Sequence, residues 1–535
     1  MSTSISQIQQ YISNNQFDKA LNICKLNIKD NPKNAVLTKL LAHIYGLKEA
    51  YMKAIEVLEG LINEFPNDFD LNNNLGFYYF KIEEFEKASF FLNKAKDINP
   101  SIAAPYQNLG EIFMSLRQFN LAENELDLCL EINAKNHSHY FIYMPTLLLR
   151  IQVYIAKKDK EGATNFILKY LLMSFHSELF LQLVQINKNA VTESLLAFCT
   201  NLLNKNTFQS SMEKFQHLVP LCFALAYYFE KKDQNKSENY FVQANLEIFS
   251  IQRLRLIDIQ NQQKKIMNMF EKIKSLEVND RTCGINNYFI VGMPRSGTTL
   301  LESIITANDE VFAGGELNAM SLLTKINILS KDQPTLSELE IVGREYLRIT
   351  NFLKQEYQSL VDKMPMNFSY LGFIHKCLPA AKTILIIRNP WDIAISLFKQ
   401  RYITNIAYSS SFFNIGVQIA NFEAMLIYWQ KSIINQKNII ILRYEDLVAE
   451  LATQQSKIYD YLGIKQSYDP KIREKFFAKT ASMTQVQSNI HQTSIKKSDF
   501  TNKFNEYFDA YSSQKEYWIR NDIKFEDSLL NIYKN

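Results

Sequence analysis

An apolar, strand-like run leads into a glycine-bounded loop at residues 288–305, YFIVGMPRSGTTLLESII. Gly292 ends the run, four residues follow, and Gly297 precedes Thr298 and Thr299. A nucleotide triphosphate loop has lysine and then serine or threonine after its second glycine. The lysine that contacts the outer phosphates of a triphosphate is absent here. The spacing therefore indicates a phosphate loop, and the missing lysine raises the question of which phosphate it holds.

The backbone of this loop is suited to an anion. Gly292 and Gly297 let the chain curl so that N–H groups from Ser296 to Thr299 point into one concavity at a helix N-terminus. Such a nest suits a single phosphate. Arg295 adds a permanent charge inside the loop, and its planar guanidinium can engage two oxygens at once. The alternative interpretation is a simple glycine turn between a strand and a helix.

Strand and helix patterns alternate from Tyr288 onward. Strands are predicted at NYFIVG, KTILIIRN and NIIILRYEDL, with helices at TTLLESIITA and PWDIAISLFKQRY. This alternation predicts an α/β domain with a central parallel sheet and covering helices. Ligands of such sheets bind beyond the carboxyl ends of the strands, which is where Gly292, Arg388 and Tyr444 fall.

The first third of the chain has a 34-residue period. Three sets of residues keep this spacing: Pro32, Pro66 and Pro100; Ala20, Ala54, Ala88 and Ala122; and Phe17, Tyr51, Phe85 and Phe119. This is the tetratricopeptide pattern. Each repeat is a helical hairpin in which small residues allow close packing and the proline stops the second helix. Several hairpins must stack to bury the apolar surface that one leaves exposed.

The sequence therefore predicts a multidomain protein. An all-α tetratricopeptide solenoid is expected over residues 1–280, with clear repeats at 5–136 and degenerate helical pairs at 137–280. The segment EVNDRTCGINN is the expected joint. A P-loop-like α/β domain then occupies residues 285–535.

Composition limits the location and the partners. The 535 residues carry a net charge of +4, so general nucleic-acid binding has little support. The six cysteines and seven histidines show no metal or disulfide spacing. The polar N-terminus lacks the apolar core of a signal peptide, and no apolar run reaches the roughly 18 residues of a membrane span. We therefore expect a cytoplasmic protein without a metal site.

Two motifs resemble those of sulfotransferases that use 3′-phosphoadenosine-5′-phosphosulfate. FIVGMPRSGTTLLESII is similar to the family's 5′-phosphosulfate loop. LIIRNPWDIAISLFKQ resembles its 3′-phosphate motif, in which an arginine ends a strand and a serine follows eight residues later; here these are Arg388 and Ser396. The resemblance covers nearly all of 285–535, and the motif order is similar to that of protein-tyrosine sulfotransferases. Together with the repeats, it identifies the chain as a tetratricopeptide-repeat sulfotransferase.

The resemblance implies a donor with one 5′-phosphate that carries a sulfuryl group. Because this donor has no β- or γ-phosphate, a kinase-type lysine and a bridging magnesium ion would have no role. Its 3′-phosphate needs a second basic site, which Arg388 and Ser396 would supply. Tyr444 matches a family tyrosine on the same side of the donor. A closing loop similar to KTASMTQVQSNIHQTSIKKSDF would contribute Ser482, or nearby Thr484, and Lys497, or Lys496 instead, although this chain lacks the aromatic residue that usually follows the lysine. Lys399 and Arg401 could also assist at the 3′-phosphate.

The resemblance also implies the catalytic groups. Glu316 in FAGGELNAM occupies the position of the base in the tyrosine-sulfating enzymes. We expect partial burial to raise its carboxyl pKa from about 4 toward neutrality. The alternative role is that of a helix-start residue near the N-terminal dipole. Lys363 in VDKMPMNF matches a lysine near the bridging oxygen, so Arg295 and Lys363 would be the transition-state cations.

Two other functions remain open from the sequence. One is a repeat scaffold for protein partners with a catalytically silent nucleotide-binding domain. The other is a phosphate-loop kinase, which Thr298 and the lack of a clear magnesium carboxylate disfavour. The acceptor hydroxyl is also open: the repeats favour a protein or peptide such as protein tyrosine, but carbohydrates, lipids and small molecules remain, and the repeats could instead mediate homodimerisation.

Overall fold

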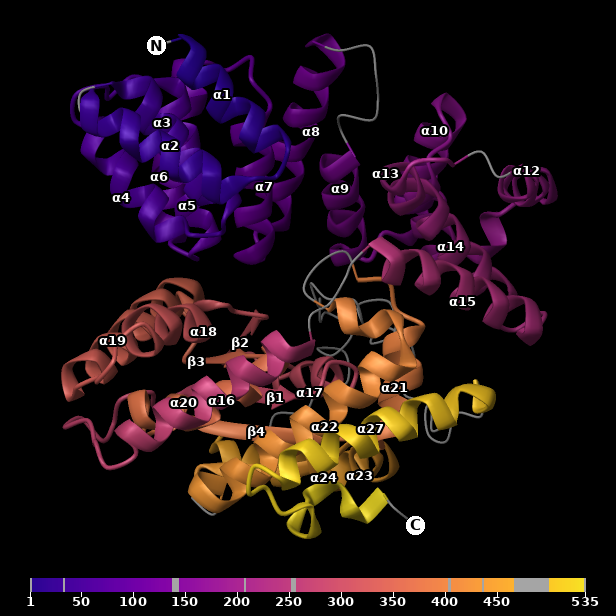
Figure 1. The fold of residues 1–535 in the computed structure, drawn as a ribbon. Helices are drawn as coiled ribbons and strands as arrows, with labels where there is room; N and C mark the ends of the chain where they lie inside the picture. Colours follow the sequence, from indigo (N-terminus) through magenta and orange to yellow (C-terminus); the bar gives the residue numbers. More distant parts are fainter. Residues whose placement is uncertain are drawn as a thin grey trace. The chain divides into compact units, whose positions relative to one another are not determined.

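The computed structural model describes residues 2–31, 34–136, 144–205, 208–251, 256–402, 406–434, 437–465 and 500–533. The chain divides into two compact units, Met1–Val153 and Tyr154–Asn535 (Figure 1). This division differs from the joint that the sequence predicts near residues 280–285. The helices between residue 154 and that joint belong to the same compact unit as the sheet. The two units are described separately below.

The first unit consists of helical hairpins. Its helices are α1 Ser2–Ser13, α2 Phe17–Asp30, α3 Ala35–Leu47, α4 Tyr51–Ile62, α5 Phe69–Lys81, α6 Phe85–Ile98, α7 Ala104–Ser115 and α8 Phe119–Asn136 (Figure 1). Helix α9, Met144–Ala156, crosses the boundary between the units. The second helix of each hairpin begins at one of the four aromatic residues that keep the 34-residue period. The predicted repeat hairpins are therefore confirmed.

Small residues hold the hairpins together as expected. A Cβ atom on Gly76 would lie 2.5 Å from Leu92 Cγ, and one on Gly110 would lie 2.7 Å from Leu126 Cγ. The four period-keeping alanines are all fully buried. The hairpin turns also repeat, because a left-handed residue recurs every 34 positions at Asn15, Glu49, Glu83 and Arg117. The period therefore sets both the helix contacts and the turn geometry.

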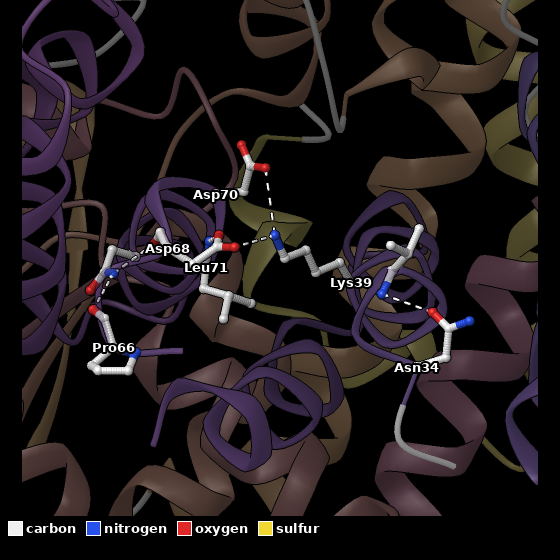
Figure 2. Close-up of polar contacts among 8 residues, drawn as sticks. Asn34, Lys39, Pro66, Asp68, Asp70 and Leu71 are labelled. Atoms are coloured by element: carbon white, nitrogen blue, oxygen red, sulfur yellow. Dashed lines mark hydrogen bonds and ion pairs between the residues drawn. The ribbon is translucent and has the colours of Figure 1, made fainter. Parts of the chain in front are cut away.

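Polar contacts tie neighbouring hairpins together in the first unit. Figure 2 shows the Lys39 ammonium reaching Asp68 and Asp70, with N–O distances of 2.6 and 3.7 Å. Asp68 also caps α5, since the Leu71 N–H donates to its carboxylate at 3.0 Å. Asn34 caps α3 in the same way by accepting from the backbone of Val36 and Leu37. These contacts fix where α3 and α5 begin.

The second unit begins with further helices. They are α10 Lys160–Met173, α11 Ser177–Ile186, α12 Glu193–Asn204, α13 Ser211–Glu213, α14 Val219–Phe229, α15 Gln234–Ile251 and α16 Leu256–Ile273. Two of them bond to the C-terminal end of α21, Pro390–Phe398. The Tyr227 hydroxyl donates to the Lys399 carbonyl at 2.6 Å, and the Asn245 amide donates to the Phe398 carbonyl at 2.9 Å. These contacts explain why this segment belongs to the same compact unit as the sheet.

Helix α16 packs deeply into the second unit. Its Phe270 ring lies 4.9 Å from the Trp429 ring, and a Cβ on Gly372 would lie 2.5 Å from both rings. The Gln260 amide donates to Gln514 Oε1 at 2.7 Å. Although α16 lies upstream of the predicted joint, it is therefore part of the core around the sheet.

A five-stranded parallel sheet organises the second unit. Its strands are β1 Asn287–Gly292, β2 Val311–Gly315, β3 Ser359–Asp362, β4 Lys382–Ile387 and β5 Ile439–Arg443, in the order β2-β3-β1-β4-β5. Figure 1 labels the first four strands in chain order. All four pairings are parallel. The predicted α/β domain with a central parallel sheet is confirmed. Sequence patterns predicted β1, β4 and β5, and they missed the short strands β2 and β3.

Helices cover this sheet. They are α17 Thr298–Ile305, α18 Ala319–Thr324, α19 Leu336–Lys354, α20 Leu371–Cys377, α21, α22 Phe412–Trp429, α23 Tyr444–Ala449, α24 Leu451–Leu462 and α27 Phe504–Ile519. Short 3₁₀ and π segments are η2 Lys188–Ala190, η3 Lys214–Leu218, η4 Lys325–Leu329, η5 Pro365–Tyr370, η6 Ala407–Ser410, η7 Gln430–Ile434, η9 Thr501–Lys503, η10 Phe525–Asp527 and η11 Leu529–Tyr533. Among the described helices, none combines the length and apolarity needed to cross a membrane.

Candidate active site

Every strand of the sheet ends next to a predicted site residue. Glu316 directly follows β2, Lys363 follows β3, Arg388 follows β4 and Tyr444 follows β5, while Arg295 lies three residues after β1. The strands are parallel, so their carboxyl ends lie along one edge of the sheet. Five segments that are distant in sequence therefore deliver these side chains to a common edge.

The loop after β1 requires its second glycine. Gly297 has a φ of +103° and precedes the first residue of α17. A Cβ at this position would also lie 2.3 Å from a ring carbon of Tyr444. Arg295 adopts a left-handed φ of +72°, which is uncommon for a residue with a side chain. The tight curl that the sequence predicts for this loop is present.

The residues of the predicted nest are buried at the start of α17. Ser296, Thr298 and Thr299 are 0%, 4% and 5% exposed. The Ser296 hydroxyl has no hydrogen-bond partner within the described part of the chain. Such a group is costly to bury unless a ligand or water satisfies it. An orphaned hydroxyl beside a helix N-terminus fits an anion such as a phosphate group.

The two predicted anion-binding regions are in direct contact. Arg295 Nε donates to the Ser396 hydroxyl at 2.9 Å. Arg388 Nη1 donates to the Arg295 carbonyl at 3.1 Å, and its guanidinium lies 4.3 Å from the centre of the Tyr444 ring. Burial lowers the pKa of Arg388 from its usual value, but an arginine stays charged. The structure therefore brings Arg295, Arg388, Ser396 and Tyr444 together.

Glu316 and Lys363 form an ion pair. The Lys363 ammonium lies 2.5 Å from Glu316 Oε1, and the backbone N–H of Lys363 donates to the Gly315 carbonyl at 2.8 Å. The Lys363 side chain is 0% exposed, whereas that of Glu316 is 41% exposed. The Glu316 side chain is therefore partly buried and partly open, while its lysine partner is fully enclosed.

Buried side chains that the sequence did not single out support this pair. Glu302 on α17 is 1% exposed and accepts from the Gly315 N–H at 3.1 Å. The Tyr346 hydroxyl on α19 donates to Asp362 Oδ2 at 2.9 Å. These contacts fix the ends of β2 and β3, from which Glu316 and Lys363 project. A lone carboxylate in the apolar segment TTLLESII was the available signal for Glu302.

A cavity of about 650 Å³ opens at this edge. Its lining includes Arg295, Thr298, Thr299 and Glu316, together with side chains from α16, η5 and α22. Tyr402, which the sequence analysis did not identify, also lines it. Burial raises the pKa of Tyr402 to about 12, while Arg295 lowers it and Glu316 raises it. The Tyr402 hydroxyl therefore lies within the electrostatic field of both site residues.

The structure describes the basic residues that follow Ser396, but not the predicted closing loop. Ser482 and Lys497 fall outside the described residues. Lys399 and Arg401, which follow the Ser396 helix, form ion pairs with carboxylates of the preceding helices: Lys399 with Glu230 at 3.1 Å, and Arg401 with Glu178. Both basic side chains thus anchor α21 to the helices upstream of the sheet.

Comparison with known proteins defines the class of each region. Residues 288–470 match the model of the sulfotransferase family, and residues 69–102 and 103–136 each match the tetratricopeptide repeat. The chain therefore contains tetratricopeptide repeats followed by a sulfotransferase domain, as the sequence predicted.

Particular relatives are similar over the sulfotransferase region. An uncharacterized protein of Aquifex aeolicus is 29% identical over 230 residues, which are 39% of this chain and 30% of that protein. Protein-tyrosine sulfotransferase A of Caenorhabditis elegans is 24% identical over 218 residues, 38% of this chain and 57% of that protein. Sulfotransferase 4A1 of Mus musculus is 22% identical over 247 residues, 43% of this chain and 80% of that protein. The chain thus spans less than two thirds of the first two relatives.

Proposed function

We propose that this protein transfers a sulfuryl group from 3′-phosphoadenosine-5′-phosphosulfate to an acceptor hydroxyl. The observation that carries the proposal is the convergence at the sheet edge of a lysine-free phosphate loop, the Arg388–Ser396 region and the Glu316–Lys363 pair. The sulfotransferase-family match of residues 288–470 supports the reaction class.

The donor would be held at two places. The backbone from Ser296 to Thr299 and the orphaned Ser296 hydroxyl are suited to the 5′-phosphate. Arg388 and Ser396, with Tyr444 against the guanidinium, are suited to the 3′-phosphate. We keep Ser482 and Lys497 as predicted donor contacts. When bound, the donor supplies a sulfuryl group whose bond to the 5′-phosphate oxygen breaks as a bond from the acceptor oxygen forms.

The chain's own residues handle charge and protons around this exchange. Glu316 is placed to accept the proton of the acceptor hydroxyl, because its carboxylate lines the cavity and is open to it. Lys363 and Arg295 hold positive charge near the position where negative charge develops on the leaving oxygen. The Lys363 ammonium is fully buried, so solvent screens it little and its field is strong.

Isothermal titration calorimetry of the full chain tests donor recognition. We expect adenosine 3′,5′-bisphosphate to bind at least tenfold more tightly than ATP, because each good charge-assisted contact to the 3′-phosphate contributes about 1.5–3 kcal/mol. Equal affinity for the two nucleotides, or a preference for ATP, would contradict the proposal and favour the kinase alternative. Binding without transfer of labelled sulfate to any acceptor in a cell extract would favour the silent scaffold.

The match to the sulfotransferase family does not identify the acceptor molecule. The repeats support interaction with another protein, and we propose that the first unit recruits a partner or a second copy of the chain. The cytoplasm is the proposed location.

A further inference from the structure

The cavity contains a set of buried polar groups that the proposed donor site does not use. Gln263 on α16, Asn367 on η5 and Gln418 on α22 are 4%, 1% and 2% exposed, and all three line the cavity. Within the described part of the chain, the side-chain oxygen of each lacks a hydrogen-bond partner, and so does the nitrogen of Asn367. Tyr402 adds a buried hydroxyl with the same property.

Such groups point to a ligand with many hydrogen-bonding positions. Buried polar atoms in folded proteins are nearly always satisfied, and leaving them unpaired is costly. Three amide oxygens require three donors, which a phenol with its single hydroxyl cannot supply. A ring with several hydroxyl groups can, because each hydroxyl both donates and accepts.

The walls that α16, η5 and α22 contribute have matching properties, and the charged lining residues, Lys325 and Arg401 among them, lie on other segments. The lining residues contributed by α16, η5 and α22 carry no charge, and they include the apolar side chains of Ile259, Ile266 and Met366. Tyr370 presents an aromatic ring whose hydroxyl is already engaged by Gln262. Apolar and aromatic surface suits the C–H face of a sugar ring, and a charged group there would be poorly solvated.

We infer that this part of the cavity is the acceptor site and that it takes an uncharged polyhydroxylated ring, a neutral carbohydrate, whose edge hydroxyls pair with Gln263, Asn367 and Gln418. The inference rests on the proposed sulfuryl transfer and names the substrate class of that same site. It also gives α16, which lies upstream of residues 288–470, a role in choosing the acceptor.

Saturation-transfer NMR on the full chain tests the inference without requiring catalysis. The probes are the methyl glycosides of glucose, galactose, mannose, fucose and N-acetylglucosamine, with methyl glucuronide as a charged counterpart of the glucoside and N-acetyltyrosine amide as a phenol. We expect at least one neutral glycoside to bind and the glucuronide and the phenol to bind at least tenfold more weakly. Binding of the phenol alone, or of no glycoside, would overturn the inference.

Leucine variants separate recognition from folding. Gln263→Leu and Asn367→Leu each replace an amide that carries an unpaired oxygen with a branched apolar side chain, so we expect glycoside affinity to fall about tenfold while the protein stays folded. Gln260→Leu is the matched control on α16: Gln260 bonds to Gln514, so its replacement should lower Tm and leave glycoside binding unchanged. Unchanged glycoside affinity in both cavity variants would refute the assignment. Calorimetry with adenosine 3′,5′-bisphosphate, run in parallel, reports separately on the proposed function.

Discussion

The buried Lys363 ammonium and the open Glu316 carboxylate form a pair with unequal surroundings. The Lys363 side chain is fully enclosed by protein, whereas the Glu316 side chain lines the cavity and is accessible to a ligand there. We therefore propose that Glu316 accepts the proton and that Lys363 supplies the fixed charge. Glu302 and Asp362, both buried, hold the strand ends from which the pair projects.

Replacing Glu316 with glutamine should slow transfer at least about 100-fold while keeping donor binding. The amide cannot accept the acceptor's proton, and general-base catalysis typically contributes about 10²–10⁴-fold in rate. Turnover with labelled donor and calorimetry with adenosine 3′,5′-bisphosphate measure the two properties. Glu356→Gln, at an exposed position before β3, is the control and should leave both unchanged. Normal turnover in the Glu316→Gln variant would show that Glu316 is not the general base.

Replacing Arg388 with lysine should remove recognition of the 3′-phosphate. A lysine cannot both bond to the Arg295 carbonyl and stack on Tyr444 as the planar guanidinium does. We expect affinity for adenosine 3′,5′-bisphosphate to fall roughly tenfold or more, and affinity for adenosine 5′-monophosphate to change little. Arg443→Lys, on the neighbouring strand end, is the control. If both nucleotides lose affinity equally, Arg388 acts on the loop and not on the 3′-phosphate.

His375 on α20 makes stability depend on pH. Its ring nitrogen Nε2 lies 3.0 Å from the Thr383 hydroxyl, and burial lowers its pKa to about 4. Because the unfolded chain takes up this proton near pH 6.5 and the folded chain does not, stability is full above about pH 6.5 and decreases as pH falls toward 4. The loss attributable to His375 is on the order of 3 kcal/mol.

Denaturant unfolding of wild type and His375→Gln at pH 7 and pH 5 should show a smaller pH effect in the variant. An identical pH effect in both proteins would contradict this assignment.

At the scale of the elements, long periodic patterns were predictable and short strands were not. The 34-residue period extends over residues 5–136, and β1, β4 and β5 are apolar runs flanked by helices. Strands β2 and β3 have five and four residues, too few to show a pattern, and β2 ends in two glycines. Glu316 and Lys363 were therefore located through resemblance, and their strand-end positions emerged only from the structure.

Sequence patterns likewise could not predict contacts between elements that are distant in the chain. Glu178 and Arg401 meet across more than 200 positions, and α16 joins the cavity although it lies upstream of the predicted joint. Nothing in the local sequence of Asn367 or Tyr402 distinguishes them from structural residues. That their polar atoms are buried and unpaired can be recognised only from the three-dimensional structure.

Removing the Glu178 carboxylate should destabilise the second unit. The side chains of Glu178 and Arg401 are 8% and 9% exposed, so Glu178→Ala leaves an uncompensated buried charge beside the Ser396 helix. We expect a loss on the order of 3 kcal/mol in the free energy of unfolding. Glu230→Ala breaks the pair with Lys399 in the same interface, where Glu230 is 34% exposed, and should cost about 1 kcal/mol or less. Equal losses in denaturant unfolding would show that burial does not distinguish the two pairs.

At the scale of the whole molecule, the two compact units differ in what stabilises them. The first relies on repeated contacts between neighbouring helices, whereas the second has the sheet and all the described site residues. A ligand that binds only the native second unit stabilises that unit by mass action and leaves the first unaffected. The units should therefore respond separately to ligand and to mutation.

Calorimetric unfolding of the full chain should show two transitions. Adenosine 3′,5′-bisphosphate at about 100 times its Kd adds about 2.7 kcal/mol to the second unit and should raise only that transition, by several degrees. Gly76→Val should lower only the midpoint of the first unit's transition, because its Cβ would lie 2.5 Å from Leu92 Cγ. Gly60→Ala is the matched control: no atom lies within 4 Å of its added Cβ, so better helix propensity should keep or raise the same midpoint. A single transition that shifts with both the nucleotide and Gly76→Val would mean that the first and second units unfold as one cooperative body.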